Sequence, residues 1–199
     1  IAIDKVGVRN VHYPISVMDR AEGSQRSVGV FQLTVDLPEE FKGTHMSRFL
    51  EVLNQFSHEI SVQAIPEMLK ALREKLHARN AHMEVQFPYF LAKPAPVTGI
   101  EGMMHYNCGF SAQQGSDNDF QVLVEVPITT LCPCSKEIAK YGAHNQRGYV
   151  KVKVRLGEHM WFEEIIKMIE DAASAPLYPV LKRPDEKFVT ELAYENPRF

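Results

Sequence analysis

The chain has 199 residues, of which 45% are hydrophobic and 24% are charged, and these fractions are typical of one soluble globular domain. A formal net charge of −3 argues against a nucleic-acid-binding protein, and no apolar run is long enough to span a membrane. Because there is no signal-peptide pattern and cysteines are few, we expect a cytoplasmic protein whose partners include neither a membrane nor a nucleic acid. The chain opens on Ile1 and stops soon after an apparent helix start, so we expect residues 1–199 to form a single domain that is incomplete at both ends.

The predicted elements begin after an N-terminal stretch, residues 1–27, that we expect to be irregular. Alternation of apolar and polar side chains then predicts strands at residues 30–37, 83–89, 104–110, 120–128 and 149–156. Apolar residues at helical spacing predict helices at residues 49–56, from Pro66 to residue 76, and at residues 161–174. Strands joined by hairpins, with helices gathered in blocks, indicate an α+β fold with an antiparallel sheet.

One short segment, LCPCSKEIAKYGAHNQR at residues 131–147, brings together Cys132, Cys134 and His144 directly after a predicted strand. A disulfide between two cysteines separated by one proline would close a strained ring, and we expect the third cysteine, Cys108, to pack within its own strand. Two interpretations remain open. The segment could hold zinc or iron in a site with one open position, or Cys134 could be a thiol nucleophile with His144 as its base.

Two further segments carry phosphate-binding or charged residue types. In KGTHMSRF, residues 42–49, Ser47 and Arg48 at a predicted helix entrance are suited to hold a phosphate, although a serine there is equally typical of a plain helix cap. In LKRPDEKFVTE, residues 181–191, acidic and basic side chains are mixed. Such a loop is, on its own, most typical of solvated surface.

These three segments, together with HYPI at residues 12–15 and FPYFLAKPAPVTGI at residues 87–100, resemble the prokaryotic type IB GTP cyclohydrolases. The resemblance runs along nearly the whole chain, and the last segment continues to its end as LKRPDEKFVTELAYENPRF. It implies one catalytic domain with a tunnelling fold, in which two helices lie on one face of an antiparallel sheet. It further implies that such sheets assemble into a multimeric barrel, a homotetramer with active sites at the subunit interfaces.

The resemblance also implies a reaction and a metal site. The substrate would be GTP, hydrolysed to 7,8-dihydroneopterin triphosphate and formate in the first step towards folate and related pterin and deazapurine products. The family's metal ligands correspond to Cys132, His144 and Glu186, which would hold one divalent Zn, Mn or Fe(II) ion per site. Cys134 would remain beside the metal as a proton donor or an alternative ligand during ring opening, so the catalytic residues expected are Cys132, Cys134 and His144.

The triphosphate of GTP requires local cationic partners, because the chain as a whole is negatively charged. The expected substrate-binding residues are Ser47, Arg48, Lys136, Arg147, Lys182 and Arg183. Among these, Ser47, Arg48 and Arg147 lie inside the family motifs and carry most weight. We expect the glutamate that anchors the guanine base to lie beyond Phe199, and Glu191 and Glu195 to lie on a helix surface.

Two alternatives belong to other classes. A nitrile reductase of the same fold would use a cysteine nucleophile and NADPH, and would need no metal. A non-catalytic metal-binding module would keep its metal but release no formate from GTP. The cysteine pair followed by His144 and Glu186 argues against the reductase, and the metal-binding module ranks below the enzyme.

Overall fold

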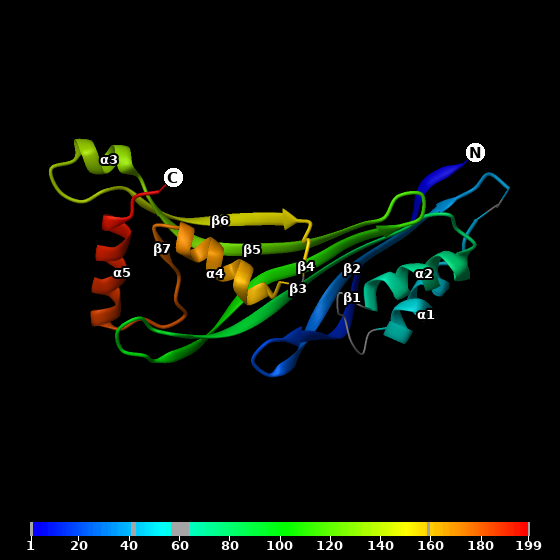
Figure 1. Cartoon of the computed structure of the whole chain (residues 1–199), viewed down its shortest axis with the longest axis horizontal. Coiled ribbons are helices and arrows are strands. Elements are labelled where there is room, and N and C mark those ends of the chain that lie inside the picture. The colour runs from blue at the N-terminus through cyan, green and yellow to red at the C-terminus, as the bar shows by residue number, and fades with distance from the viewer. Residues whose placement is uncertain (1, 41–42, 57–63, 159, 199) are drawn as a thin grey trace. The chain divides into compact units, whose positions relative to one another are not determined.

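A computed structural model describes residues 2–40, 43–56, 64–158 and 160–198 (Figure 1). The elements in chain order are β1 (Ile3–Asp19), β2 (Gly23–Leu37), α1 (Ser47–Phe56), α2 (Ala64–Leu76), β3 (Ala81–Pro94), β4 (Glu101–Gln114), β5 (Asp119–Leu131), α3 (Pro133–Ile138), β6 (Asn145–Val154), α4 (Phe162–Ala172), β7 (Ala175–Pro176) and α5 (Arg183–Glu195). The strands follow the order β1-β2-β3-β4-β5-β6, with β7 paired to β5, and the β1–β2, β2–β3 and β5–β7 pairings are antiparallel. The predicted α+β class with an antiparallel sheet is therefore confirmed.

No helix in the described ranges combines the length and apolar character needed to cross a membrane.

The N-terminal stretch corrects one prediction, because residues expected to be irregular form β1 and the start of β2. The alternation that would reveal β1 is interrupted by irregular pairing between Val8 and Val11, where Asn10 takes a positive φ of 57°. The turn into β2 is held by Asp19, whose carboxylate accepts hydrogen bonds from the backbone N–H groups of residues 21 and 22 at 2.8 Å each. Gly23 then supplies a φ of +80°, which a side chain would disfavour. The hairpin is therefore built from turn chemistry and a bulge that simple alternation does not reveal.

The chain divides into two compact units. Unit 1 comprises Ile1–Pro88, Cys108–Leu123 and Lys153–His159, and unit 2 comprises Tyr89–Asn107, Val124–Val152 and Met160–Phe199. Strands β3 to β6 therefore contribute residues to both units. Each unit is best understood through its own core.

The core of unit 1 lies between one face of its strands and the pair α1 and α2 (Figure 1). Phe31 and Leu33 are buried two residues apart in β2, and Val85 is buried in β3. Leu69 and Leu72 of α2 are buried at helical spacing. The predicted strand in β2 and the predicted helices in α1 and α2 are confirmed. Burial of these apolar side chains is the main stabilising term in this unit.

In unit 2, α4 packs on the sheet through Phe162, whose ring lies 5.2 Å from that of Tyr89. The helix predicted at residues 161–174 is thereby confirmed. A smaller buried cluster of Leu131, Ala175 and Ala193 joins the end of β5 to β7 and α5. This cluster positions the segment that follows β5, which carries the cysteines.

Candidate metal and nucleotide site

The cysteine loop begins where β5 ends, at Leu131, and it is closed by three hydrogen bonds. The backbone N–H of Cys132 donates to the carbonyl oxygen of His144 at 2.9 Å. The hydroxyl of Ser135 donates to the carbonyl oxygen of Cys132 at 3.0 Å, and it accepts from the backbone N–H of His144 at 2.7 Å. Pro133 opens α3 directly after Cys132, where its missing N–H is not needed. Two of the three expected metal ligands are thus held side by side.

The loop also favours the thiolate form of Cys132. A hydrogen bond from the backbone N–H of Ser135 lowers the pKa of this thiol below its ordinary value, and desolvation only partly opposes that effect. The Ser135 hydroxyl and Cys134 act in the same direction. A thiolate is the form required both for metal binding and for nucleophilic attack. Local geometry therefore supports an active cysteine at residue 132 without choosing between the two chemistries.

The three cysteines are free, as the sequence predicts. Cys108 is buried within β4, consistent with the packing role expected for it, whereas Cys134 is exposed. An exposed thiol two residues from Cys132 remains available to a substrate or to a metal.

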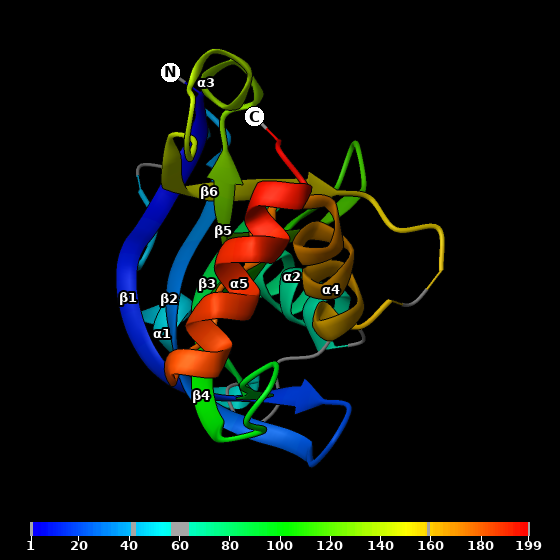
Figure 2. The same cartoon turned by 90° about the vertical axis from the view of Figure 1, so that its left-hand side faces the viewer.

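Glu186, the third expected ligand, lies apart from the cysteine loop. It is in the first turn of α5, where its carboxylate pairs with the guanidinium of Arg183 at 2.7 Å. The loop instead adjoins the other end of this helix, where Ala193 packs against Leu131, roughly 10 Å farther along the helix axis. Figures 1 and 2 show α3 beside the C-terminal end of α5. Accordingly, no three His, Cys, Asp or Glu side chains of the described residues are grouped to hold a metal.

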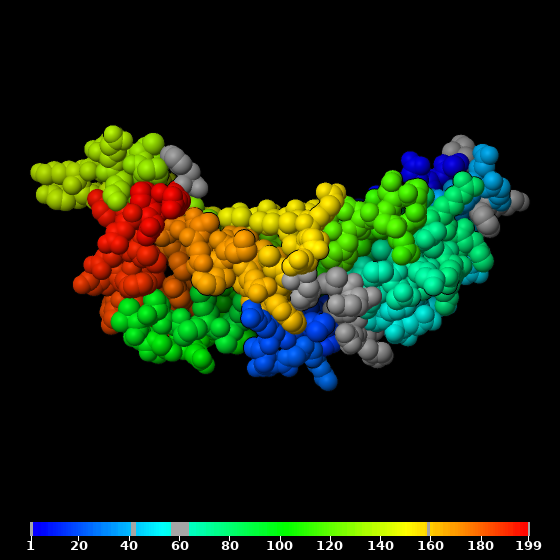
Figure 3. All heavy atoms as spheres, viewed as in Figure 1, coloured from blue at the N-terminus to red at the C-terminus, as the bar shows by residue number. Residues whose placement is uncertain are grey.

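The loop itself projects from the surface of unit 2 beside α5 (Figure 3). Its tip carries Ile138 and Tyr141, which are 87% and 84% exposed. Large apolar side chains this exposed are a feature of interaction surfaces.

The expected phosphate-binding residues are divided between the units. Lys136 donates to the carbonyl oxygen of Tyr194, with its ammonium 4.1 Å from the centre of that ring, and Arg183 is held by Glu186. Ser47 and Arg48 begin α1 in unit 1, where Arg48 donates to the carbonyl oxygen of Lys75 at 3.1 Å. The remaining two residues, Lys182 at the start of α5 and Arg147 on β6, are in unit 2.

The comparisons with known proteins decide the family. The profile described as type I GTP cyclohydrolase FolE2 matches residues 1–199. The chain is 52% identical over 198 residues to GTP cyclohydrolase FolE2 of Magnetococcus marinus, an alignment that covers 99% of this chain and 75% of that protein. Proteins of the same name from Kosmotoga olearia and Thermosipho melanesiensis are 52% and 53% identical, with 100% of this chain and 77% of each relative covered.

The chain belongs to the type I GTP cyclohydrolase FolE2 family. The resemblance inferred from the sequence motifs is thereby confirmed at the level of the family.

Asp185, which precedes the expected metal ligand Glu186, differs from the sequence-based expectation. The mixed charges of residues 181–191 predict a solvated loop, but Asp185 lies in helix α5 and is 0% exposed. Its carboxylate accepts hydrogen bonds from the backbone N–H groups of Val97, Thr98 and Lys182 at 2.9 Å each, and from the Thr98 hydroxyl at 2.8 Å. Burial alone would raise the pKa of Asp185, but these hydrogen bonds outweigh it and hold that pKa well below the usual range. Asp185 therefore ties the loop between β3 and β4 to the helix that carries Glu186.

Part of the signal for the position of Asp185, its place in a helix start, was present in the sequence. Lys182, Pro184 and Asp185 occupy the cap, the first turn and the third helical position, a pattern typical of a helix start. The pattern predicts the helix, whereas the partners of Asp185 in the distant loop depend on the fold.

Proposed function

We propose that this protein is a metal-dependent GTP cyclohydrolase I that converts GTP and water into 7,8-dihydroneopterin triphosphate and formate, the first step of folate biosynthesis. The observation that carries the proposal is the FolE2 family match over the whole chain, with relatives about half identical. In this proposal both units belong to one catalytic domain of a cytoplasmic enzyme.

Cys132, His144 and Glu186 would hold one divalent Zn, Mn or Fe(II) ion. The donor set suits such an ion, because thiolate and imidazole favour zinc and iron while a carboxylate also tolerates manganese. The lowered pKa of Cys132 and the hydrogen bonds that fix its backbone beside His144 support this assignment. When bound, the metal supplies a Lewis acid that activates water for attack on the purine ring.

Cys134 has a separate role in the proposal. It is exposed and two residues from Cys132, so its thiol is free to donate a proton to a ring nitrogen of the purine as the ring opens, or to serve as an alternative ligand. His144, as a ligand, would not be the base. Proton transfer therefore falls to Cys134, to another histidine or to water.

The triphosphate would be bound by Ser47, Arg48, Lys136, Arg147, Lys182 and Arg183. Of these, Lys136 and Arg183 already have carbonyl or carboxylate partners within unit 2, which limits their mobility before a phosphate arrives. Binding would exchange these partners for phosphate oxygens, with which both an ammonium and a guanidinium form charge-assisted hydrogen bonds.

Assembly into a homotetramer with a tunnelling fold and interfacial sites completes the proposal. The separation of Glu186 from Cys132 within one chain supports it, because a second copy could bring its own Glu186 to the cysteine loop. The exposed Ile138 and Tyr141 at the tip of that loop provide the apolar surface that such a contact would bury.

The test combines metal content with formate release from GTP. We expect the intact protein to carry metal and release formate, Cys132→Ala to lose both, and Cys134→Ala to keep the metal but turn over poorly. Cys108→Ala is the matched control, since it removes a buried thiol outside the site and should leave both properties intact.

The outcomes separate the alternatives. Metal retention without formate release by the intact protein would indicate a binding module. Absence of metal, together with NADPH-dependent reduction of a nitrile that requires Cys134, would indicate the reductase and overturn the proposal.

A further inference from the structure

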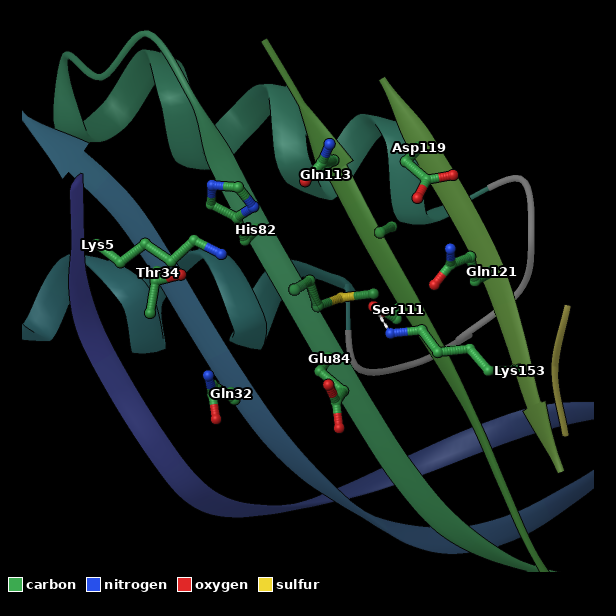
Figure 4. Close-up of a pocket in the computed structure, with 12 residues that line it drawn as sticks. Lys5, Gln32, Thr34, His82, Glu84, Ser111, Gln113, Asp119, Gln121 and Lys153 are labelled. Carbon is green, nitrogen blue, oxygen red and sulfur yellow. Dashed lines mark hydrogen bonds between the residues drawn. The ribbon is translucent and has the colours of Figure 1, made fainter. Parts of the chain in front are cut away.

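Unit 1 carries a polar hollow on one face of its sheet (Figure 4). Its volume is ≈ 260 Å³, and strands β1 to β6 all contribute lining residues. In β2, Gln32 and Thr34 face the hollow, whereas the alternate residues Phe31 and Leu33 are buried in the core. Figure 4 shows α1 and α2 behind these strands, so the hollow lies on the face that the helices do not cover.

Two lysines reach over this face from the first and last strands of the β1–β6 order. Figure 4 shows Lys5 of β1 and Lys153 of β6 with both ammonium ends pointing inward over the sheet. The ammonium of Lys153 donates to the hydroxyl of Ser111 at 3.2 Å. His82 lines the hollow beside Lys5, and its pKa lies below the ordinary value because of burial and the positive charge of Lys5. The two lysines, and not His82, therefore bring positive charge over this face, and His82 offers a hydrogen bond beside them.

The two carboxylates in the lining compensate this charge only in part: the Arg155 guanidinium and, more weakly, the Lys153 ammonium lower the pKa of the Asp119 carboxyl. Asp119 is held by the guanidinium of Arg155 through two hydrogen bonds of 2.6 and 2.8 Å. Glu84 accepts a hydrogen bond from the neutral side chain of Gln86 at 2.8 Å and keeps its negative charge at one side of the hollow. An anion between the lysines would thus meet two ammonium groups, with one carboxylate placed to accept from a hydroxyl.

The size and lining of the hollow define the class of ligand. Its volume is slightly below the roughly 300–1,000 Å³ typical of ligand pockets, so it suits a molecule smaller than a nucleotide. The described residues that line it include no Phe, Tyr or Trp on which a base could stack. Amide and hydroxyl groups from Gln32, Thr34, Ser111, Gln113 and Gln121 offer hydrogen bonds instead.

We propose that this hollow binds a small phosphorylated molecule, with its phosphate between Lys5, His82 and Lys153 and its hydroxyl groups directed to Glu84. None of the residues that line this site is among those proposed to bind the metal or the triphosphate. It provides a second, non-catalytic ligand site on this protein.

Calorimetric titration with inorganic phosphate at low ionic strength tests the proposal on the full chain. The Cys132→Ala background removes the proposed metal but keeps the residues proposed to bind the triphosphate, so the Lys5 and Lys153 variants, rather than the parent alone, assign bound phosphate to the hollow. We expect phosphate to bind, and Lys5→Gln or Lys153→Gln to weaken binding about tenfold or more, because each removes a charge-assisted hydrogen bond. Lys70→Gln on α2 makes the same charge change on the helical side of unit 1 and should bind phosphate like the parent.

The arginine variants Lys5→Arg and Lys153→Arg keep the charge and should retain phosphate binding, which separates a lost contact from a misfolded protein. Absence of phosphate binding in the parent would overturn the proposal. Phosphate binding by the Lys5→Gln/Lys153→Gln double variant with the same stoichiometry and affinity as the parent would also overturn it, and would place the anion elsewhere. A change in sedimentation caused by these variants, with phosphate binding unaltered, would identify the face as a contact between copies of this chain instead.

Discussion

The two units differ in the interactions that hold helices and loops against their strands. In unit 1 the core is apolar, with strand residues such as Leu33 facing helix residues such as Leu72, and the charged residues are on the opposite face. In unit 2 two carboxylates are largely buried: Asp185 holds the loop between β3 and β4, and Glu170 of α4 binds Lys93 of β3 and Tyr106 of β4. The backbone groups of the β3–β4 loop need the polar partner that Asp185 provides, whereas α1 and α2 pack on the strands of unit 1 through apolar side chains. Unit 1 has a buried carboxylate in Asp19, but it lies at the β1–β2 turn, so we expect the packing of α4 and α5 in unit 2 to depend more on charge than the packing of α1 and α2 in unit 1.

Glu170 of α4 gives the largest expected effect. Its carboxylate accepts from the ammonium of Lys93 at 2.7 Å and from the hydroxyl of Tyr106 at 2.8 Å, and the two charged side chains are only 12% and 14% exposed. Burial lowers the pKa of Lys93, although Glu170 partly restores it. Glu170→Gln would leave a buried ammonium unpaired, and we expect the free energy of unfolding to fall by about 3–5 kcal/mol. Denaturant unfolding measures this change.

A second substitution sharpens the interpretation. In the Glu170→Gln background, Lys93→Met should recover part of the lost stability because it removes the unpaired charge. If the double variant is less stable than Glu170→Gln alone, the ion pair is not what holds this part of unit 2.

Leu72→Ala tests the apolar side of the comparison. Leu72 is 0% exposed in α2, and removing a fully buried leucine side chain costs about 2–5 kcal/mol. Because no charge is involved, this cost should stay constant between acid and neutral pH, as measured by denaturant unfolding. The exposed Lys70 on the same helix is the control, and Lys70→Ala should change stability by less than about 0.5 kcal/mol. A strong pH dependence of the Leu72→Ala effect would contradict the conclusion that apolar packing holds α2 on the strands of unit 1.

Asp185→Asn should show the pH dependence that Leu72→Ala lacks. The folded-state pKa of Asp185 is lowered, so its carboxylate contributes stability above its unfolded pKa near 3.8 and loses it as pH falls through the folded value. We expect a Tm lower by roughly 5 °C or more near neutral pH, with the difference from the intact protein shrinking at acid pH. Thermal unfolding between about pH 3 and 7 measures both features.

Asp171→Asn is the matched control for that experiment, because Asp171 is 62% exposed and pairs with the exposed Lys167 on the surface of α4. The Tm of the Asp171→Asn variant should differ little from that of the intact protein at any pH. A Tm difference for Asp185→Asn that does not depend on pH would mean that its charge contributes nothing.

Ser135→Ala gives the smallest expected effect on stability but a specific effect on the proposed metal. The hydroxyl of Ser135 links the backbones of Cys132 and His144, so its loss should weaken metal affinity roughly 10–100-fold. Competition with a chromophoric chelator measures this affinity. Ser27→Ala removes a comparable hydroxyl in unit 1, where Ser27 donates to the carbonyl oxygen of Pro88 at 2.7 Å, and should leave metal affinity unchanged. Equal metal affinity in the two variants would contradict the linking role of Ser135.

The sequence by itself determined the regular parts of the fold. The strands predicted at residues 83–89, 104–110, 120–128 and 149–156 lie within or largely within β3, β4, β5 and β6, and the predicted helices correspond to α1, α2 and α4. Alternation and helical spacing succeed here because each element buries one face, and burial imposes its own period on the sequence. The family, too, was readable from the motifs alone.

Other features were decided only by the tertiary structure. The strand β1 was missed because its bulges break alternation, and Asp185 was misjudged because its partners lie some ninety residues away in the chain. The distance of Glu186 from the cysteine loop, and the convergence of Lys5 with Lys153, likewise depend on which elements become neighbours. Local sequence patterns record which side of an element is buried, but the polar partners of a side chain are fixed only when distant segments meet, and that is a property of the fold.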